Sequence, residues 1–326
     1  MEKKKIVYYN IAGNLDYEKS LLEEWKIDGL ELVEVKDPEE KNFISAVLEA
    51  QGLVVEYEEI TKEVLSHAPK LKCIALQSIG YNNIDTKAAE QAGVYVTNAP
   101  GYCAPEVAEH TIGLMLALDR KIPFFDRQVR KGHWNPTEGY PLYRIAGKTV
   151  GLVFFGEIPK RMVPVLKAFE MKILVYAPTK SGEYLSSFGC KKVELEELLH
   201  ESDFVSLHCP LIKGVTEHLI GEAELKKMKP TSFLINTARG AIVDEKALVK
   251  ALRQGWIRGA GIDVLEREQS AESDLTDMEE RVVITPHAAY ISEDALHEGR
   301  RIALEQLVSC IIMEERPKNA VNEIKL

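Results

Sequence analysis

Three side chains suited to acid–base chemistry on an anionic substrate, Arg239, Glu268 and His287, each come shortly after an apolar segment of the sequence. A carboxylate beside an imidazole stabilises the imidazolium and fixes its tautomer. A guanidinium binds a carboxylate through two parallel hydrogen bonds and polarises a neighbouring carbonyl group. We therefore predict that these residues form a catalytic set.

The alternative for His287 is a structural role, which is the commoner role of a single histidine. Arg239 and Glu268 favour catalysis, because all three residues occupy matching positions after predicted strands of one sheet. In open parallel sheets, ligands bind beyond the carboxyl ends of the strands.

A candidate dinucleotide-binding loop follows the predicted strand 149–153 and opens a helix, but it departs from the G-x-G-x-x-G pattern. Gly156 is the middle glycine, which lets the backbone approach a phosphate. Phe154 stands in place of the first glycine, where a tight turn leaves little room for a ring. Pro159 replaces the third and is tolerated, because the first turn of a helix does not need its N–H. An ordinary strand–turn–helix is an equally good interpretation of this loop.

Glu157 adds a charge problem to the same loop. A carboxylate ~5 Å from a phosphate, at an effective dielectric constant of ~20, costs roughly 3 kcal/mol. Lys160 and Arg161, one turn further on, are expected to offset part of that repulsion.

A second cofactor contact is expected after the predicted strand 172–176, where an acidic residue would bind the ribose hydroxyls of NAD. Ala177 occupies that position instead. Without the acid nothing repels a 2′-phosphate, and Lys180 and Ser181 are close enough in sequence to contact one. These residues mildly favour NADP over NAD. The alternative is that Lys180 is a solvated loop lysine.

The elements that position these residues alternate between strand and helix, which predicts parallel sheets covered by helices on both faces. The predicted strands are residues 6–9, 52–55, 73–76, 149–153, 172–176, 204–207, 232–235, 259–261 and 282–284. The predicted helices are residues 105–118, 126–131, 244–254 and 293–313, with a further helix start at 37–40. Gly255 is suited to end the helix 244–254.

The composition is that of a globular protein. The chain has 326 residues, 45% of them apolar and 28% charged, which favours two domains of roughly 150 residues. A net charge of −10 argues against nucleic acid as a partner. No apolar stretch has the ~20 residues of a membrane span. The five cysteines are scattered and form no Cys-x-x-Cys, so we expect a reduced, cytoplasmic protein without a metal.

Taken together, these features resemble the D-isomer-specific 2-hydroxyacid dehydrogenase family over nearly the whole chain. The segments that carry the resemblance are SIGYNNID (78–85), VTNAPGY (96–102), VAEHT (107–111), LHCPL (207–211), MKP (228–230), INTARG (235–240), GIDV (261–264) and TPH (285–287). Such a set at family-like spacing is highly specific for the fold.

The resemblance implies roles for the catalytic set. His287 would protonate the ketone oxygen as hydride arrives, Glu268 would be its paired carboxylate, and Arg239 would anchor the substrate. Glu266 competes with Glu268 for the pairing, because the family's proline-rich spacing is altered here. Asp263 would lie near the nicotinamide amide.

Other contacts follow from the same resemblance. The backbone amides of Ile79 and Gly80 would hold the substrate carboxylate. The residues expected to contact the cofactor are Gly156, Glu157, Ile158, Ala177, Lys180, Cys209, Pro210, Thr237, Ala238 and Asp263.

The family's layout predicts two Rossmann/flavodoxin-like domains, with parallel sheets, helices on both faces and an active-site cleft between them. Residues 1–99 plus 289–326 would form the substrate domain, and residues 100–288 the dinucleotide-binding Rossmann domain. Gly132-His133-Trp134 resembles the family's dimer arm, so a homodimer is expected.

The sequence favours an enzyme that moves hydride between NAD or NADP and a small 2-oxo or 2-hydroxy acid. One alternative is a catalytically impaired descendant that binds or regulates, similar to the family's corepressor branch, because the G-x-G-x-x-G loop is altered. Another is an enzyme that binds a different ligand in that loop.

Overall fold

The computed structural model describes residues 3–37, 42–268 and 273–324, and the chain divides into two compact units. The first unit comprises Met1–Cys103 and Ile291–Leu326, and the second comprises Ala104–Tyr290. Each unit contains one sheet, and every pairing between neighbouring strands of these sheets is parallel. The fold class predicted from the alternating pattern, parallel sheets with helices, is therefore confirmed.

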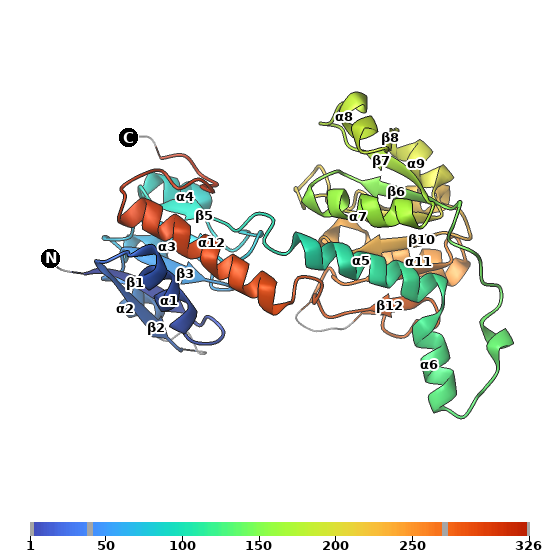
Figure 1. The fold of residues 1–326 in the computed structure, drawn as a ribbon, viewed down its shortest axis with the longest axis horizontal. Coiled ribbons are helices and arrows are strands. Elements are labelled where there is room, and N and C mark those ends of the chain that lie inside the picture. The colour runs from blue at the N-terminus through green and yellow to red at the C-terminus, as the bar shows by residue number, and fades with distance from the viewer. Residues whose placement is uncertain (1–2, 38–41, 269–272, 325–326) are drawn as a thin grey trace. The chain divides into compact units, whose positions relative to one another are not determined.

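The first unit has a five-stranded sheet in the order β2-β1-β3-β4-β5 (Figure 1). Its strands are β1 (Lys4–Tyr9), β2 (Leu30–Val35), β3 (Gly52–Val55), β4 (Cys73–Leu76) and β5 (Tyr95–Thr97). Its helices are α1 (Asp16–Trp25), α2 (Phe43–Val47), α3 (Lys62–Ser66), α4 (Thr86–Gln91) and α12 (Glu293–Ile311). Ile6 and Tyr8 pack toward α1 and α12, whereas Val7 and Tyr9 pack toward α2, α3 and α4. Burial on both faces explains why residues 6–9 of β1 are apolar throughout.

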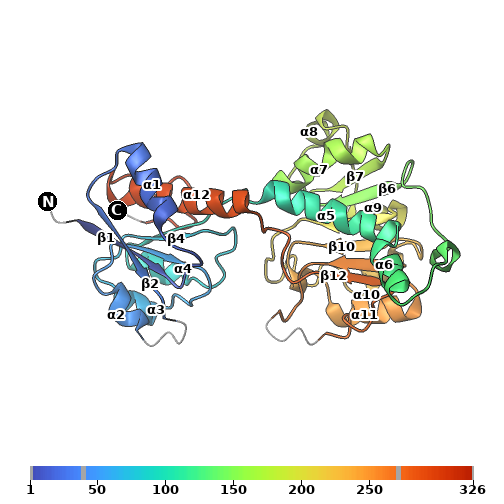
Figure 2. The ribbon, with the colours of Figure 1, turned by 60° about the horizontal axis from the view of Figure 1, so that its bottom comes forward.

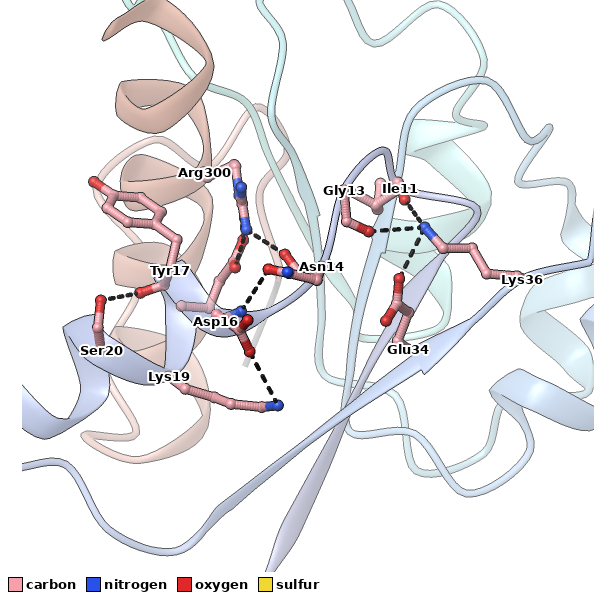
Figure 3. Close-up of polar contacts among 11 residues, drawn as sticks. Ile11, Gly13, Asn14, Asp16, Tyr17, Lys19, Ser20, Glu34, Lys36 and Arg300 are labelled. Atoms are coloured by element: carbon pink, nitrogen blue, oxygen red, sulfur yellow. Dashed lines mark hydrogen bonds and ion pairs between the residues drawn. The ribbon is translucent and has the colours of Figure 1, made fainter. Parts of the chain in front are cut away.

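A buried ion pair fastens α12 to α1. Glu18 is fully buried and accepts a hydrogen bond of 2.8 Å from Arg300 Nε, with a second from Arg300 Nη2. Arg300 Nη2 also donates to the carbonyl of Asn14 at 2.6 Å, and the guanidinium lies 5.3 Å from the centroid of the Tyr17 ring. Figure 3 shows Arg300 reaching from α12 toward the loop that contains Asn14. Removing either partner would leave an unpaired buried charge, so this pair ties α12 to α1.

The second unit has a seven-stranded sheet in the order β12-β11-β10-β9-β6-β7-β8. Its strands are β6 (Thr149–Val153), β7 (Lys172–Tyr176), β8 (Lys191–Lys192), β9 (Phe204–Leu207), β10 (Phe233–Asn236), β11 (Gly259–Ile262) and β12 (Val282–Ile284). The direction of strand order reverses between β6 and β9, which is the kind of switch point where open α/β sheets bind ligands.

Helices cover both faces of this second sheet. The helices of this unit are α5 (Ala104–Asp119), α6 (Ile122–Arg130), α7 (Glu157–Ala168), α8 (Gly182–Ser187), α9 (Leu195–Glu201), α10 (Glu222–Lys227) and α11 (Glu245–Gln254), with the 3-10 turns η1 (Pro136–Gly139) and η2 (Gly240–Ile242), and all of the α-helices except α6 cover the sheet. Buried residues of α5, α7 and α8 share one core cluster, and those of α9, α10 and α11 share the other. α6 and η1 extend away from the sheet of this unit (Figures 1 and 2).

Most predicted elements are confirmed, with shifted ends. The strand predicted at 232–235 is Phe233–Asn236, and the amphipathic helix predicted at 126–131 begins at Ile122. Gly255 ends α11 in the left-handed conformation, as expected. The helix start predicted at 37–40 falls mostly outside the described residues, and the described helix α2 begins at Phe43. In the part of the chain that the structure describes, no helix combines the length and apolar character that a bilayer span requires.

Candidate active site

Arg239, Glu268 and His287 come together at the carboxyl ends of β10, β11 and β12 in the second unit. His287 Nδ1 lies 2.8 Å from Glu268 Oε2. Their side chains are 39% and 42% exposed, so a small ligand has access to the pair. Arg239 is close enough for its charge to act on the Glu268 carboxylate.

The electrostatics of this group keep Glu268 ionised. Burial raises the pKa of the Glu268 carboxyl, but the hydrogen bond from His287 and the charges of His287 and Arg239 outweigh burial, so the pKa lies below its ordinary value. An ionised carboxylate only accepts hydrogen bonds, so His287 Nδ1 carries the hydrogen that joins the pair. Nε2 is then the imidazole nitrogen left to exchange a proton with a ligand.

Glu266, the competing partner for His287, is engaged elsewhere. Its Oε1 lies 2.9 Å from His218 Nε2 and accepts a hydrogen bond of 3.1 Å from the backbone N–H of Glu245. The Glu266 N–H donates in return to Glu245 Oε2 at 3.1 Å. Glu266 therefore holds the start of α11, and Glu268 is the carboxylate that pairs with His287.

Arg239 is presented by a turn that Asn236 closes. Asn236 Nδ2 donates to the Arg239 carbonyl at 2.9 Å, and Asn236 Oδ1 accepts from the Ala238 N–H at 3.1 Å. The next residue must be glycine, because a Cβ on Gly240 would lie 2.0 Å from the carbonyl group of Leu265. This close approach brings the Arg239 turn against the segment that leads to Glu268.

The His287 turn is held by Asp263, which is 2% exposed. His287 has φ = 52°, a left-handed conformation that costs a side-chain-bearing residue roughly 1–2 kcal/mol. The Asp263 carboxylate accepts from Thr285 Oγ1 (2.5 Å) and from the N–H groups of Ala288 (2.9 Å) and Ala289 (3.0 Å), and the Asp263 carbonyl accepts from the His287 N–H (2.7 Å). From the sequence, Asp263 was expected only to contact the cofactor, and this role of its carboxylate was not predicted.

Phe154 has φ = 73°, a left-handed backbone conformation that favours glycine. Its N–H donates to the Tyr176 carbonyl at 2.7 Å, and its ring packs edge-on against the Tyr176 ring with centroids 6.3 Å apart. At Gly156, the N-cap of α7, a Cβ would have no neighbouring atom within 4 Å, and among the described residues no side chain caps the helix. Open space beside uncapped N–H groups suits a phosphate.

Glu157 is neutralised within its own helix. Its carboxylate lies 2.6 Å from Lys160 Nζ, and this hydrogen bond raises the pKa of Lys160 above its ordinary value. The repulsion expected from a lone carboxylate is therefore reduced. Ile158 packs against the core under α7 and Pro159 is buried, so Ile158 offers a ligand mainly its backbone N–H.

Ala177 is buried at the end of β7; one lysine, Lys180, lies in the loop that follows, and a second, Lys192 of β8, contacts that loop. Lys180 Nζ lies 5.5 Å from the centroid of the Tyr184 ring, and Lys192 Nζ donates to the Lys180 carbonyl at 2.6 Å. Ser181 Oγ caps α8 by accepting from the Tyr184 N–H at 3.1 Å. Lys192 was not predicted to lie near the cofactor, because it belongs to β8 and to no local sequence motif.

The remaining predicted cofactor contacts differ in exposure. Burial raises the pKa of the Cys209 thiol to about 11, and the side chain packs in the core, whereas Pro210 is exposed. Thr237 is buried with its Oγ1 2.8 Å from Thr111 Oγ1, and Ala238 packs against the core edge. Any cofactor contact of Cys209 must therefore come from its backbone.

Ile79 and Gly80 belong to the first unit and follow β4. The Ile79 carbonyl accepts from Asn98 Nδ2 at 2.8 Å, and the Gly80 carbonyl accepts from Ser78 Oγ at 3.0 Å. Among the residues described, neither backbone N–H has an acceptor, so both are available to an anion. In the same described ranges, no group of three or more histidine, cysteine, aspartate and glutamate side chains is arranged to hold a metal ion.

Comparison with known proteins agrees with this geometry. Residues 112–289 match the family model described as D-isomer specific 2-hydroxyacid dehydrogenase, NAD binding domain. The chain is 42% identical over 298 residues to a glyoxylate reductase of Thermococcus litoralis, which covers 88% of each protein.

Solved structures share the fold over almost the whole chain. A D-isomer specific 2-hydroxyacid dehydrogenase from Lactobacillus delbrueckii ssp. bulgaricus, in an NAD complexed form, has a TM-score of 0.80 at 30% identity and covers 98% of this chain and 100% of its own. An acyclic imino acid reductase in complex with NADPH and D-Arg has a TM-score of 0.84 at 30% identity and covers 97% and 99%. The chain therefore belongs to the D-isomer-specific 2-hydroxyacid dehydrogenase family and is an NAD(P)-dependent enzyme of that family.

Proposed function

We propose that this enzyme reduces a small 2-oxo acid, with glyoxylate as the first candidate, to the corresponding 2-hydroxy acid. The observation that carries the proposal is the pair of His287 and Glu268 at 2.8 Å, with Arg239 beside it. The choice of glyoxylate is supported by the 42% identity to a protein named glyoxylate reductase.

In the proposed reaction each side chain has one task. Arg239 binds the substrate carboxylate and polarises the adjacent carbonyl group. Glu268 accepts a hydrogen bond from His287 Nδ1. This contact stabilises the imidazolium and directs Nε2 to the substrate. Nε2 donates its proton to the ketone oxygen as that oxygen gains negative charge. The reduced nicotinamide, when bound, supplies the hydride to the carbonyl carbon.

We further propose NADPH as the preferred cofactor. Ala177 removes the carboxylate that would repel a 2′-phosphate, and Lys180 and Lys192 add positive charge to the same loop. The uncapped first turn of α7 would hold the pyrophosphate, and the Gly156 position leaves space for it.

The test is a steady-state assay of the wild-type chain with NADPH and with NADH, against glyoxylate, pyruvate and a branched 2-oxo acid. We expect oxidation of the reduced cofactor with glyoxylate and a lower KM for NADPH than for NADH. Calorimetric titration of both dinucleotides separates the alternatives. Tight binding without turnover on any 2-oxo acid would favour the non-catalytic family member, and absence of both would contradict the proposal.

We propose a homodimer formed through α6 and the segment after it. None of the residues of α6 is buried, and Ile122, Val129 and Trp134 are 57%, 47% and 86% exposed. Ile122 and Val129 are seven residues apart and therefore lie on one face of α6, and exposed apolar side chains gathered on one face are typical of interaction surfaces. Light scattering after gel filtration tests the assembly, and a monomer at micromolar concentration would contradict it.

A cytoplasmic location and the assignment of the first unit to substrate and the second to dinucleotide remain part of this proposal.

A further inference from the structure

We infer that His110 and Thr111, in the second turn of α5, are positioning residues that hold the turns of His287 and Arg239 in place. This inference rests on the proposed function, because it assigns His287 and Arg239 their roles. α5 packs against β10, β11 and β12, the strands that lead to the catalytic set. The approach is close: a Cβ on Gly261 of β11 would lie 3.1 Å from Leu114 Cβ.

His110 contacts the turn of His287 through Thr285. His110 Nε2 lies 2.9 Å from Thr285 Oγ1 and 3.6 Å from Asp263 Oδ1, and its side chain is only 25% exposed. The Thr285 hydroxyl donates its one hydrogen to Asp263 Oδ1 at 2.5 Å. Thr285 Oγ1 must therefore accept from His110, which requires the His110 proton to be on Nε2.

The direction of these hydrogen bonds makes a chain that ends at the His287 turn. His110 donates to Thr285, Thr285 donates to Asp263, and Asp263 accepts from Ala288 and Ala289. The left-handed backbone of His287 is strained by itself and persists because the surrounding bonds hold it. Asp263 and Thr285 follow neighbouring strands of the sheet, whereas His110 belongs to a helix, so its hydrogen bond fixes the turn to α5.

Thr111 makes the matching contact with the turn of Arg239. Thr111 is fully buried, and its hydroxyl donates to the Val107 carbonyl at 2.6 Å. Its oxygen must then accept from Thr237 Oγ1, which lies 2.8 Å away and two residues before Arg239. Adjacent residues of one helix therefore anchor the two turns, and their spacing along α5 helps to set the distance between the guanidinium and the imidazole.

Kinetics of single variants test the inference. We expect His110→Leu to lower kcat roughly tenfold to a hundredfold with a small change in KM, because it loosens the proton donor. His110→Gln keeps an N–H donor near the same position and should restore most of that loss. Thr111→Val should instead raise KM for the 2-oxo acid several-fold, because it loosens the substrate anchor. His200→Gln is the matched control, since His200 is exposed and faces only Glu196 at 3.9 Å.

Hydrogen exchange gives a readout that does not depend on turnover. In the chain without cofactor, His110→Leu should speed exchange in the peptide 285–289 relative to wild type, whereas His200→Gln should not. The inference would be overturned if His110→Leu had the kcat and the exchange rate of the wild type. It would also be overturned if His110→Gln folded but did not recover activity. If His287→Gln retained full activity, the proposed function itself would fail, which is a distinct outcome.

Discussion

Two regions of the second unit depend on different kinds of atoms. They are the catalytic edge, at the ends of β10, β11 and β12, and the cofactor loop, at the end of β6. At the ends of β10, β11 and β12, the chain has an arginine, a glutamate and a histidine whose side-chain atoms form the candidate site. At the end of β6, a phenylalanine and a proline replace two glycines of the usual pattern, yet Phe154 keeps a glycine-like backbone with φ = 73°.

The difference follows from which atoms each region uses. General acid–base proton transfer at neutral pH is most often carried out by an imidazole side chain, whose chemistry the backbone conformation does not supply. A phosphate at a helix N-terminus is bound by backbone N–H groups, so side chains can change as long as the backbone conformation and the space beside Gly156 are kept. Residue identity is therefore a stricter requirement at the catalytic edge than at the cofactor loop.

The largest expected effect in this comparison is the fall in kcat when His287 is replaced. His287→Gln removes the proton donor and should lower kcat by about 10²–10⁴-fold with dinucleotide affinity retained. The measurement is the steady-state rate with glyoxylate and NADPH, together with calorimetric binding of NADPH. A variant within threefold of wild type, folded and saturated with substrate, would remove His287 from the chemistry.

A second prediction sharpens the catalytic edge itself. Glu268→Gln replaces an ionised partner of His287 by a neutral one, and a charge-assisted hydrogen bond of roughly 2 kcal/mol corresponds to a fall in kcat of about 30-fold. Glu266→Gln, the matched control, alters only the contacts with His218 and Glu245 and should leave kcat nearly unchanged. Equal losses in the two variants would show that the pairing has been assigned wrongly.

Much of the fold could be predicted from the sequence, because strands buried on both faces are apolar throughout. The edge strand β2 was missed, since Glu31 and Glu34 interrupt its apolar residues where one side faces water. The grouping of Arg239, Glu268 and His287 could be predicted for a related reason. All three come after apolar strands of one parallel sheet, and the carboxyl ends of such strands lie at one edge.

What escaped prediction depends on contacts between distant elements. His110 and Thr285 are 175 positions apart, and Lys192 approaches the Lys180 loop only because β8 pairs with β7. The Phe154 substitution was read as a steric problem, because a sequence does not reveal that the ring packs toward Tyr176. Only the three-dimensional structure shows that the glycine was replaced while the backbone conformation was kept.

A third prediction concerns the cofactor side of the comparison. Lys180→Glu reverses a charge beside the expected 2′-phosphate and should weaken NADPH binding about tenfold, equivalent to about 1.4 kcal/mol, with little change for NADH. Lys191→Glu is the control, because Lys191 is exposed and pairs with Glu197 at 2.7 Å. Dissociation constants for both dinucleotides give the measurement. Equal weakening of NADPH and NADH would mean that Lys180 does not contact the 2′-phosphate.

The smallest effect tests whether the cofactor loop conserves backbone conformation, and it compares two substitutions at one position. Phe154→Gly and Phe154→Ala both remove the ring and its contact with Tyr176, so both lose the same packing. Only alanine keeps the strain of φ = 73°, which costs an L-residue roughly 1 kcal/mol more than glycine. Chemical denaturation should therefore find the glycine variant about 1 kcal/mol more stable than the alanine variant, although glycine ordinarily loses more entropy on folding. The reverse order would mean that the loop does not hold the left-handed backbone of a dinucleotide turn, and the contrast between a strict catalytic edge and a permissive cofactor loop would then lose its physical basis.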